Sequence, residues 1–438
     1  MRTSLIFGIL VIVSLLSCQK VEVEQLMQAA PEQRIKDSVD FIKKSLQSAP
    51  YGWHGGIGTS ARGGYGFYIK FDADNTLQML SDYSVVSGNT VQSSTYRVAA
   101  TSVPSLLFDT YNYISLMQDP VPGVAGGTAS SGYKSDVEYM YRMTAGDTLV
   151  FEGRKYKNPL MLVKNTQAQQ ELFLNKGFNT YKNTFSQLYD GYKFTYIENE
   201  TQVLAIELDL AAKLARFSLI DKSNKSLSSS VNSAFYFSEH NANLVIPIVF
   251  GKKRIIGLSI KDNKLSINYS DGTVDEVRQQ DTPTYSIESV FDYNKTFKRI
   301  LSTVVPGVSA NQHIFSAVRT AFSGTGRTIS SMYFAFTSST NLNFYIGYSN
   351  ATTSFNAQAN YTYRREGNKI FIKRANTNGN WDSRVAELTA VNNFFGTGEE
   401  REFTLEWVSS TDASVKYPIA AIRSATNNMN MLYGKLGE

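Results

Sequence analysis

Short runs in which every second residue is large and apolar constrain this chain more than any other feature of the sequence. One run covers residues 65–71, where such residues alternate with small or polar ones, and another covers residues 139–143. A period of two is typical of strands with one face on a core and the other in solvent. We therefore expect half-buried β-strands, for which the 26 Tyr and 26 Phe of the chain supply much of the apolar face.

Turn residues separate the alternating runs at the spacing of hairpins. They occur at Asp74-Asn75, Glu198-Asn199-Glu200, Asp262-Asn263, Asp271-Gly272 and Glu366-Gly367-Asn368. A parallel sheet needs a crossover between successive strands, usually a helix, and no helical pattern lies between these runs. The strands are therefore predicted to form antiparallel meanders.

Helical periodicity precedes each group of strands. Pro31 suits the first turn of a helix, and apolar residues then recur at helical spacing as far as Leu46, which predicts an amphipathic helix over residues 31–48. Further helices are expected over residues 173–188, 287–300 and 314–322. The sequence thus predicts a mainly β protein with a few helices, of the α+β class. In it, a helix followed by an antiparallel meander is repeated three times and forms barrel- or sandwich-like domains.

The order of these elements divides the chain into five parts. We assign a signal peptide to residues 1–17, a tether to 18–25, and helix-plus-meander blocks to 26–165, 166–282 and 283–438. The boundary before the third block lies in a polar stretch that contains proline, residues 279–284. The second block either folds as a domain of its own or packs with the first block as one domain.

The first eighteen residues have the pattern of a cleaved export signal. Arg2 provides the positive charge, residues 5–16 are apolar but shorter than the about 20 residues that span a bilayer, and Ser17 is small. The next residue, Cys18, is the only cysteine, so a disulfide within the chain is excluded. Residues 15–18 resemble a bacterial lipobox. We therefore expect Cys18 to become the acylated N-terminus, carrying palmitate and anchoring the chain in the outer membrane.

Motifs that could carry catalysis are weak. Asp72 and Asp74 have the spacing of aspartate-nucleophile phosphatases but lie in a turn, whereas that chemistry needs the end of a buried parallel strand. Residues 53–64 contain a variant of the dinucleotide fingerprint but follow a helix, so we expect a flexible connection there. The three histidines lie in different blocks, and the net charge of +5 is too small for a nucleic-acid surface. No catalytic residue, metal, cofactor or nucleic-acid partner is therefore predicted, although a carboxylate pair for glycan hydrolysis stays open.

Five residues are candidates for binding a ligand. Trp53 either plugs the core beneath the first helix or offers a stacking platform, and His54 follows it. Asp109, Tyr111 and Asn112 belong to an aromatic stretch with polar tips. Such a stretch suits either a cross-strand ladder or a wet binding face.

Two further segments are candidates for roles at the surface. Residues 119–132 are rich in glycine and proline and show no periodicity, so we expect a mobile loop at the rim of a site. Ser38 and Thr148 lie in short Asp-Ser/Thr-aliphatic patterns, which are similar to the O-glycosylation sequon of Bacteroidota. Both residues are therefore candidates for glycan attachment.

Several segments of the N-terminal half carry a family resemblance. They are Tyr51-Gly52-Trp53, Gly64-Tyr65-Gly66-Phe67-Tyr68, Phe71-Asp72-Ala73-Asp74-Asn75, Ser81-Asp82 and Leu107-Phe108-Asp109-Thr110-Tyr111-Asn112. Together they resemble a family of uncharacterised lipoproteins from gut Bacteroidota with a domain of unknown function, and the acidic pattern of residues 19–24 is similar to the surface-export signal of such lipoproteins. The resemblance implies no catalytic residue. It implies a setting, as an accessory of TonB-dependent uptake systems in the outer membrane.

These expectations combine into one functional hypothesis. The chain is expected to be a lipoprotein of the outer membrane that is held by its acyl chains and faces the cell exterior. There it would bind a small nutrient, a glycan, a peptide or haem, together with a TonB-dependent receptor complex. A glycan hydrolase with a carboxylate pair and a structural envelope protein are the alternatives.

Overall fold

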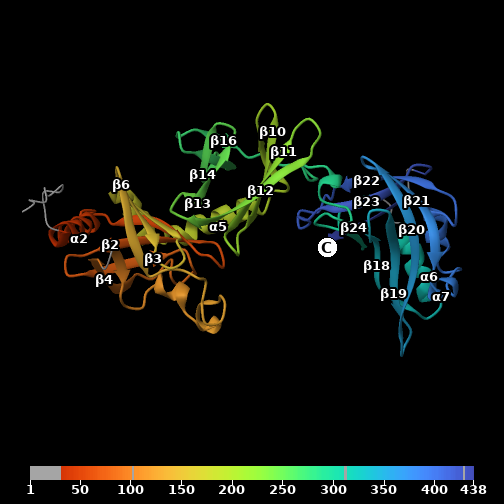
Figure 1. The fold of residues 1–438 in the computed structure, drawn as a ribbon, viewed down its shortest axis with the longest axis horizontal. Helices are drawn as coiled ribbons and strands as arrows, with labels where there is room; N and C mark the ends of the chain where they lie inside the picture. The colour runs from red at the N-terminus through yellow and green to blue at the C-terminus, as the bar shows by residue number, and fades with distance from the viewer. Residues whose placement is uncertain (1–30, 101–102, 310–312, 428–429) are drawn as a thin grey trace, which may run out of the picture.

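The computed structural model describes residues 31–100, 103–309, 313–427 and 430–438. Within them lie three eight-stranded antiparallel sheets, each formed by strands that pair with their neighbours in sequence. Figure 1 shows the sheets one after another along the longest axis, the first in red to yellow, the second in green and the third in blue. The predicted mainly β fold with antiparallel meanders is confirmed.

The first sheet is a closed barrel, because β1 pairs with both β2 and β8. Its strands are β1 (Trp53–Gly58), β2 (Gly64–Phe71), β3 (Thr76–Ser81), β4 (Gln92–Ala100), β5 (Pro104–Phe108), β6 (Glu138–Ala145), β7 (Thr148–Gly153) and β8 (Pro159–Lys164). The predicted first helix is α2 (Pro31–Gln47), whose Ile42 and Leu46 are fully buried in the core of the barrel. Between β5 and β6 lie the short helices η1 (Ser115–Gln118) and α3 (Pro122–Ala125).

The second sheet follows two helices, α4 (Gln167–Leu174) and α5 (Gly177–Tyr189), where one helix was predicted. Lys176 has a left-handed backbone with φ 68° and separates them. The strands are β9 (Thr195–Glu198), β10 (Gln202–Asp209), β11 (Leu214–Asp221), β12 (Leu227–Phe237), β13 (Asn241–Phe250), β14 (Lys253–Lys261), β15 (Lys264–Tyr269) and β16 (Val274–Glu276). A bridge between Tyr196 and Arg278 links the two ends of this sheet, which makes it barrel-like.

The third sheet is a closed barrel in which β17 pairs with β24. Its strands are β17 (Arg299–Ser302), β18 (Thr328–Phe336), β19 (Asn341–Ser349), β20 (Ser354–Glu366), β21 (Lys369–Thr377), β22 (Arg401–Val408), β23 (Ile419–Ser424) and β24 (Met431–Gly437). The remaining helical elements are η2 (Ile287–Ser289), α6 (His313–Gly324), α7 (Gly379–Asp382) and α8 (Thr389–Phe395).

The helix predicted over residues 287–300 is wrong. Only one 3-10 turn forms there, and the apolar spacing of the segment ends in strand β17, where Ile300 enters the barrel core. Helix α6 therefore comes after the first strand of the third sheet rather than before it. A helix followed by a meander, repeated three times, is thus not confirmed.

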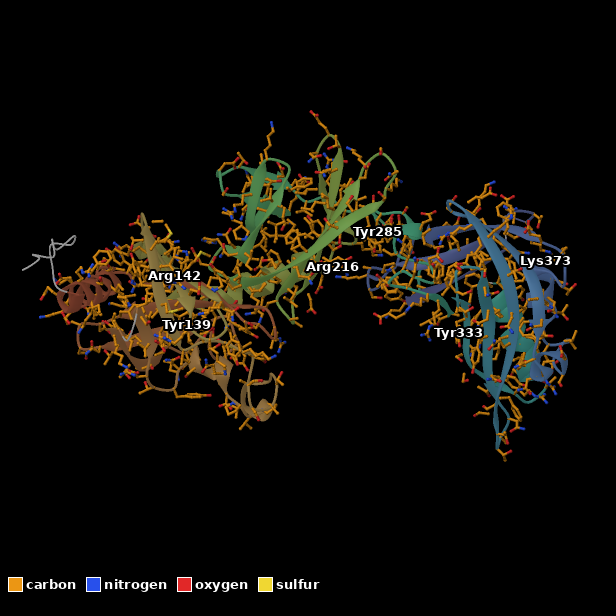
Figure 2. The ribbon with its side chains drawn as sticks, in the orientation of Figure 1. Tyr139, Arg142, Arg216, Tyr285, Tyr333 and Lys373 are labelled. Carbon is orange, nitrogen blue, oxygen red and sulfur yellow. The ribbon has the colours of Figure 1, made fainter. Side chains whose placement is uncertain are left out.

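Each sheet encloses its own apolar core. Tyr139 lies inside the first barrel and is fully buried, whereas Lys373 is exposed on the third (Figure 2). The prediction of half-buried strands fails for β2, which is buried on both faces. Its odd-numbered residues face the barrel core, and its other face packs against β12 of the second sheet.

The third barrel contacts the segments that flank the second sheet, namely the connection after β16 and the end of α5. The indole nitrogen of Trp407 donates a hydrogen bond to the carbonyl of Tyr285 at 2.8 Å, and Lys416 lies 3.1 Å from a carboxylate oxygen of Asp190. The division of the chain into domains at residues 165 and 282 stays a prediction.

Candidate functional site

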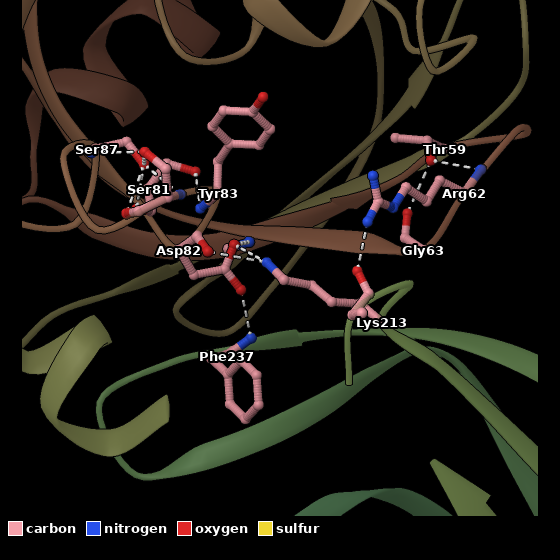
Figure 3. A network of polar contacts seen from close by, with 12 residues as sticks. Thr59, Arg62, Gly63, Ser81, Asp82, Tyr83, Ser87, Lys213 and Phe237 are labelled. Atoms are coloured by element: carbon pink, nitrogen blue, oxygen red, sulfur yellow. Dashed lines mark hydrogen bonds and ion pairs between the residues drawn. The ribbon is translucent and has the colours of Figure 1, made fainter. Parts of the chain in front are cut away.

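A buried ion pair joins the first barrel to the second sheet. Asp82 follows β3, and Lys213 lies in the turn between β10 and β11. The ammonium of Lys213 lies 2.6 Å from Oδ1 of Asp82 and also donates to the Asp82 carbonyl at 3.0 Å. The carboxylate accepts two backbone N–H bonds as well, from Gly66 at 2.9 Å and from Phe237 at 2.8 Å (Figure 3). Asp82 thus holds three segments of the chain together.

Glycines on β1 and β2 allow the second sheet to approach this closely. A Cβ added at Gly66 would lie 2.2 Å from the carbonyl oxygen of Phe237, and one added at Gly56 would lie 2.3 Å from the ring of Tyr236. No side chain larger than hydrogen fits at such distances without moving the backbone. The flexible connection predicted over residues 53–64 is therefore wrong, because these residues form β1, a turn and the start of β2, and they pack against β12.

A cleft of about 600 Å³ lies beside the ion pair, between the first barrel and the second sheet. Its walls come from the β1–β2 turn, β2, the loop after β3, the β5–β6 connection, α5 and the β10–β11 turn. Three tyrosines and three cationic residues dominate the lining: Tyr65, Tyr83, Tyr133, Arg62, Lys182 and Lys213. The volume is within the range of about 300–1,000 Å³ that small-molecule sites occupy.

The positive charges of the lining are only partly neutralised. Arg62 donates hydrogen bonds to the hydroxyl of Tyr133 at 2.9 Å and to the carbonyl of Ala211 at 2.6 Å, neither of which is charged. In the part of the chain that the structure describes, no carboxylate pairs with Arg62 or Lys182. Lys213 alone has a carboxylate partner, so the cleft carries an excess of positive charge.

The three tyrosines form one aromatic wall. The ring of Tyr65 stacks on that of Tyr133 with centroids 5.7 Å apart, and it lies 5.8 Å from that of Tyr83. The hydroxyls of Tyr83 and Tyr133 both donate to the carbonyl of Ala125, at 2.7 and 2.5 Å. These bonds attach the predicted rim loop, residues 119–132, to the wall. Among the described residues the hydroxyl of Tyr65 has no hydrogen-bond partner, so it is free to bond a ligand.

Burial changes the ionisation of two groups in the lining. Desolvation lowers the pKa of Lys213 to about 8, although the negative charge of Asp82 partly offsets this effect. Desolvation also raises the pKa of Tyr65 well above its ordinary value, and the neighbouring Tyr133 raises it further. The phenol of Tyr65 therefore stays protonated at neutral pH and can donate a hydrogen bond.

Two of the five predicted ligand-binding residues lie in the interior. Trp53 is 1% exposed, and its indole nitrogen donates to the carbonyl of Leu46 at 2.7 Å, so it is the core plug beneath α2. Asn112 is fully buried, and its side-chain oxygen accepts hydrogen bonds from the backbone of Ile114 and Ser115, both at 2.9 Å. Neither side chain presents a surface to a ligand, which corrects that expectation.

His54 and Asp109 lie apart from each other and outside the lining of the cleft. Nδ1 of His54 is within hydrogen-bonding distance, 2.7 Å, of the side-chain oxygen of Asn165. Asp109 is exposed and forms an ion pair with Arg97 at 2.9 Å. Both residues therefore have structural partners in the first barrel.

Tyr111, the fifth predicted ligand-binding residue, presents a surface to solvent but does not line the cleft. It is 55% exposed. Burial, followed by the neighbouring Tyr133, raises the pKa of Tyr83 in the cleft. The aromatic stretch around Tyr111 is a turn rather than a cross-strand ladder, because β5 ends at Phe108.

The predicted modification sites differ in accessibility. Ser38 is exposed on α2, and its hydroxyl donates to the carbonyl of Arg34 at 2.8 Å. Thr148 is the first residue of β7 and is half-buried. Cys18 lies outside the described residues.

A second cleft, of about 330 Å³, lies on the second sheet and has an acidic lining. Its carboxylates are Glu198, Asp275 and Glu276. They are held, in that order, by Lys222 at 2.7 Å, by the hydroxyl of Tyr269 at 2.7 Å and by Lys264 at 2.9 Å. Because each carboxylate already has a partner, the second cleft offers no uncommitted carboxylate pair for hydrolysis.

Two other searches of the described residues gave negative results. No group of three or more His, Cys, Asp or Glu side chains there is arranged to hold a metal ion. Among the helices in those residues, none combines the length and apolarity needed to cross a bilayer.

The sequence did not identify the residues that dominate the cleft, because they come from segments far apart in the chain. One signal pointed to this region. The segment Gly64-Tyr65-Gly66-Phe67-Tyr68 and the pair Ser81-Asp82 both belong to the segments of the family resemblance. In the structure these segments form the interface beside which the cleft lies.

Comparisons with known proteins identify a family, and two solved structures align with the chain at low similarity. A search of curated proteins found no match. Among solved structures, MucB in complex with MucA(peri) aligns at 7% identity over 79% of this chain and 90% of that chain, with a TM-score of 0.09. A post-proline cleaving enzyme from Rickettsia typhi aligns at 8% identity over 92% of this chain and 64% of that chain, with a TM-score of 0.11. Scores this low carry no argument about fold.

A family model described as "Domain of unknown function (DUF4302)" matches residues 24–262. The match spans more than half of the chain. It covers the first barrel, α4, α5 and the second sheet as far as the end of β14, and so includes every wall of the cleft. The chain therefore belongs to the DUF4302 family.

Proposed function

We propose that this protein binds a small nutrient ligand in the cleft between its first barrel and second sheet, as an accessory of an uptake system. The observation that carries the proposal is the lining, in which tyrosine rings and unpaired cationic groups converge on a space of about 600 Å³. Ligand sites favour such concave places between domains, where a few polar groups fix the orientation of the ligand.

The composition of the lining favours binding over hydrolysis. Within the described residues that line the cleft there is no Asp or Glu, whereas a glycosidase needs two carboxyl groups about 5–10 Å apart. A purely structural envelope protein gives no reason for three cationic residues and three tyrosines to converge on one concave space. The cleft therefore supports a binding accessory better than either alternative.

A binding experiment tests the role of the cleft. The full chain, purified from membranes in detergent, would be titrated in a calorimeter with glucose, glucuronate, a dialanine peptide and haem. Ala211 and Ala73 are both exposed in hairpin turns, but only Ala211 lines the cleft. We expect at least one ligand to bind, and we expect Ala211→Trp to abolish that binding while Ala73→Trp preserves it. The proposal fails if no ligand binds, or if the two variants behave alike.

We also propose that the chain is a lipoprotein anchored through Cys18 in the outer membrane of a member of the Bacteroidota. It would face the cell exterior beside a TonB-dependent receptor. The sequence pattern before Cys18 and the family resemblance support this location, and α2 begins 13 residues after Cys18, as a tethered domain would. Labelling with palmitate should mark the wild-type chain and not Cys18→Ala, and protease added to intact cells should cleave the protein. An unlabelled wild-type chain would refute the anchor, and full protection from protease would refute the outward orientation.

A further inference from the structure

We propose that the ligand of this cleft is an acidic saccharide, a sugar ring that carries a carboxylate. The inference rests on the proposed function, because it names the class of ligand for the same site. Three features of the lining carry it: the excess of positive charge, the free donors of Arg62, and the combination of the Tyr83 ring with the free hydroxyl of Tyr65.

The charge of the lining selects for an anion. Asp82 neutralises Lys213 and is itself occupied by two backbone N–H groups, so it has little capacity left for a second cation. Arg62 and Lys182 reach the same cleft, and the described residues supply no carboxylate to either. A cleft with unpaired cations and a low-dielectric wall concentrates negative ligands.

Arg62 is positioned to receive a carboxylate. A guanidinium has five N–H donors in a planar fork. Two of them are used by the hydroxyl of Tyr133 and the carbonyl of Ala211, and these two bonds fix the plane of the group. The remaining donors, including the Nε–H, are available. A planar carboxylate matches this geometry with two parallel hydrogen bonds.

The rest of the lining suits a sugar ring. Tyr65 and Tyr133 are only 4% and 3% exposed and stack on each other, so the half-buried ring of Tyr83 is the aromatic surface of the lining against which the C–H groups of a pyranose can pack. The free hydroxyl of Tyr65 lies on the same surface and can bond a ring hydroxyl. A fatty acid would find few aliphatic side chains here, since Leu210 is the largest of them. The chemistry of the lining thus favours a charged and hydroxylated ring.

A set of matched sugars tests this assignment. The full chain would be titrated with glucuronate, glucose and glucose 6-phosphate, which share one ring and differ in charge and in the shape of the anion. We expect glucuronate to bind about tenfold or more tightly than glucose, as a hydrogen-bonded charge pair supplies, and to weaken as salt is added. Tighter binding of glucose 6-phosphate than of glucuronate would overturn the carboxylate in favour of a phosphate.

Substitutions of Arg62 and Lys182 show whether glucuronate binds in the cleft or is attracted only by the overall charge of the protein. Lys182→Gln and Arg62→Lys should each weaken glucuronate binding about tenfold and reduce its preference over glucose. Lys36→Gln removes the same charge from the exposed face of α2 and should change nothing. A cooperative thermal unfolding transition of each variant shows that it is folded. Lys182→Gln is the variant less prone to disturb folding, because Lys182 is only half-buried on α5.

The outcomes distinguish this inference from the proposed function. If a peptide, haem or glucose binds in a manner that Ala211→Trp abolishes, but glucuronate has no advantage over glucose, the cleft is a binding site and the acidic saccharide is wrong. If glucuronate binds equally to wild type, Lys182→Gln and Arg62→Lys, the assignment of its carboxylate is wrong. If no ligand binds at all, both proposals fail together.

Discussion

The ammonium of Lys213 and the carboxylate of Asp82 lie 2.6 Å apart, although 131 residues separate them in the sequence. Their side chains are 5% and 0% exposed. Charges removed from water in this way are stable only while they are paired, because either one alone would be left buried without compensation. The contact between the first barrel and the second sheet therefore depends on both residues.

Replacing Lys213 by methionine should destabilise the protein strongly. The variant leaves the charge of Asp82 buried and unpaired, which costs about 3–5 kcal/mol. Unfolding in urea, followed by tryptophan fluorescence, measures the change. Lys264→Met is the matched control, because the ion pair of Lys264 with Glu276 is 56% exposed on each side and should contribute little. Equal effects of the two substitutions would contradict a special role for the buried pair.

The lowered pKa of Lys213 makes the stability of the protein depend on pH. Burial lowers this pKa to about 8 in the folded chain, from 10.5 in its absence. Between these values the unfolded chain binds more protons than the folded chain, so this group makes stability rise with pH. The difference in unfolding free energy between the wild type and Lys213→Met should shift in favour of the wild type as the pH rises from about 8 to 10.5. Below a pH of about 7 this difference should not change with pH. The urea midpoints of both proteins over this range provide the measurement. If the midpoint of the wild type falls relative to that of Lys213→Met as the pH rises, the pKa of Lys213 is raised instead.

Gly66→Ala should weaken the interface between the first barrel and the second sheet. The added Cβ would lie 2.2 Å from the carbonyl oxygen of Phe237, so the two sheets must separate, and overpacking of this kind costs about 1–3 kcal/mol or more. Gly123→Ala provides the control, because no atom lies within 4 Å of the Cβ that it would add in α3. Thermal unfolding should reveal a loss for the first variant alone. A tolerated Gly66→Ala would mean that the interface is looser than described.

Trp53→Phe should reduce stability without affecting the cleft. It removes the indole hydrogen bond to the buried carbonyl of Leu46, a loss of about 1–3 kcal/mol, and leaves a gap beneath α2. Because Trp53 does not line the cleft, the affinity for glucuronate should stay at the wild-type value. Calorimetry on the folded variant checks this point. A loss of affinity with unchanged stability would restore Trp53 as a residue that contacts ligand.

Much of the fold could be predicted from local sequence patterns. Periodicity identified α2 and several strands, among them β2 and β6, because in each of these elements the residues that face the nearby core recur at a regular spacing. It failed for β12, residues 227–237, whose first half is exposed and built from serine, asparagine and valine. It failed also for β1, because the glycines that permit close packing leave no alternation of large apolar and polar residues in this strand. The pattern is absent where a strand packs through its backbone or lies in solvent.

The cleft could not be predicted in the same way. Arg62, Lys182 and Lys213 belong to a turn, a helix and a second turn, and only the packing of one sheet on another brings them together. The sequence offered Trp53 and Asn112 as binding candidates, since an aromatic ring and an amide are common in binding sites, but it also left a core plug open for Trp53 and a cross-strand ladder for the stretch with Asn112. In the folded chain their polar groups are used for internal hydrogen bonds. Residue type indicates what a side chain can do, whereas its neighbours determine whether a ligand can reach it.

The close packing of β1 and β2 on β12 has an evolutionary consequence. The two sheets share a glycine-lined contact, the buried ion pair of Lys213 with Asp82, and the walls of one cleft. Recombination that exchanged only one of the sheets would therefore leave one buried ion unpaired and remove part of the cleft wall. The two sheets are therefore heritable only as a unit, which agrees with a family model that spans both. The described residues of the third barrel do not line the cleft, so substitutions there leave the walls of the cleft unchanged.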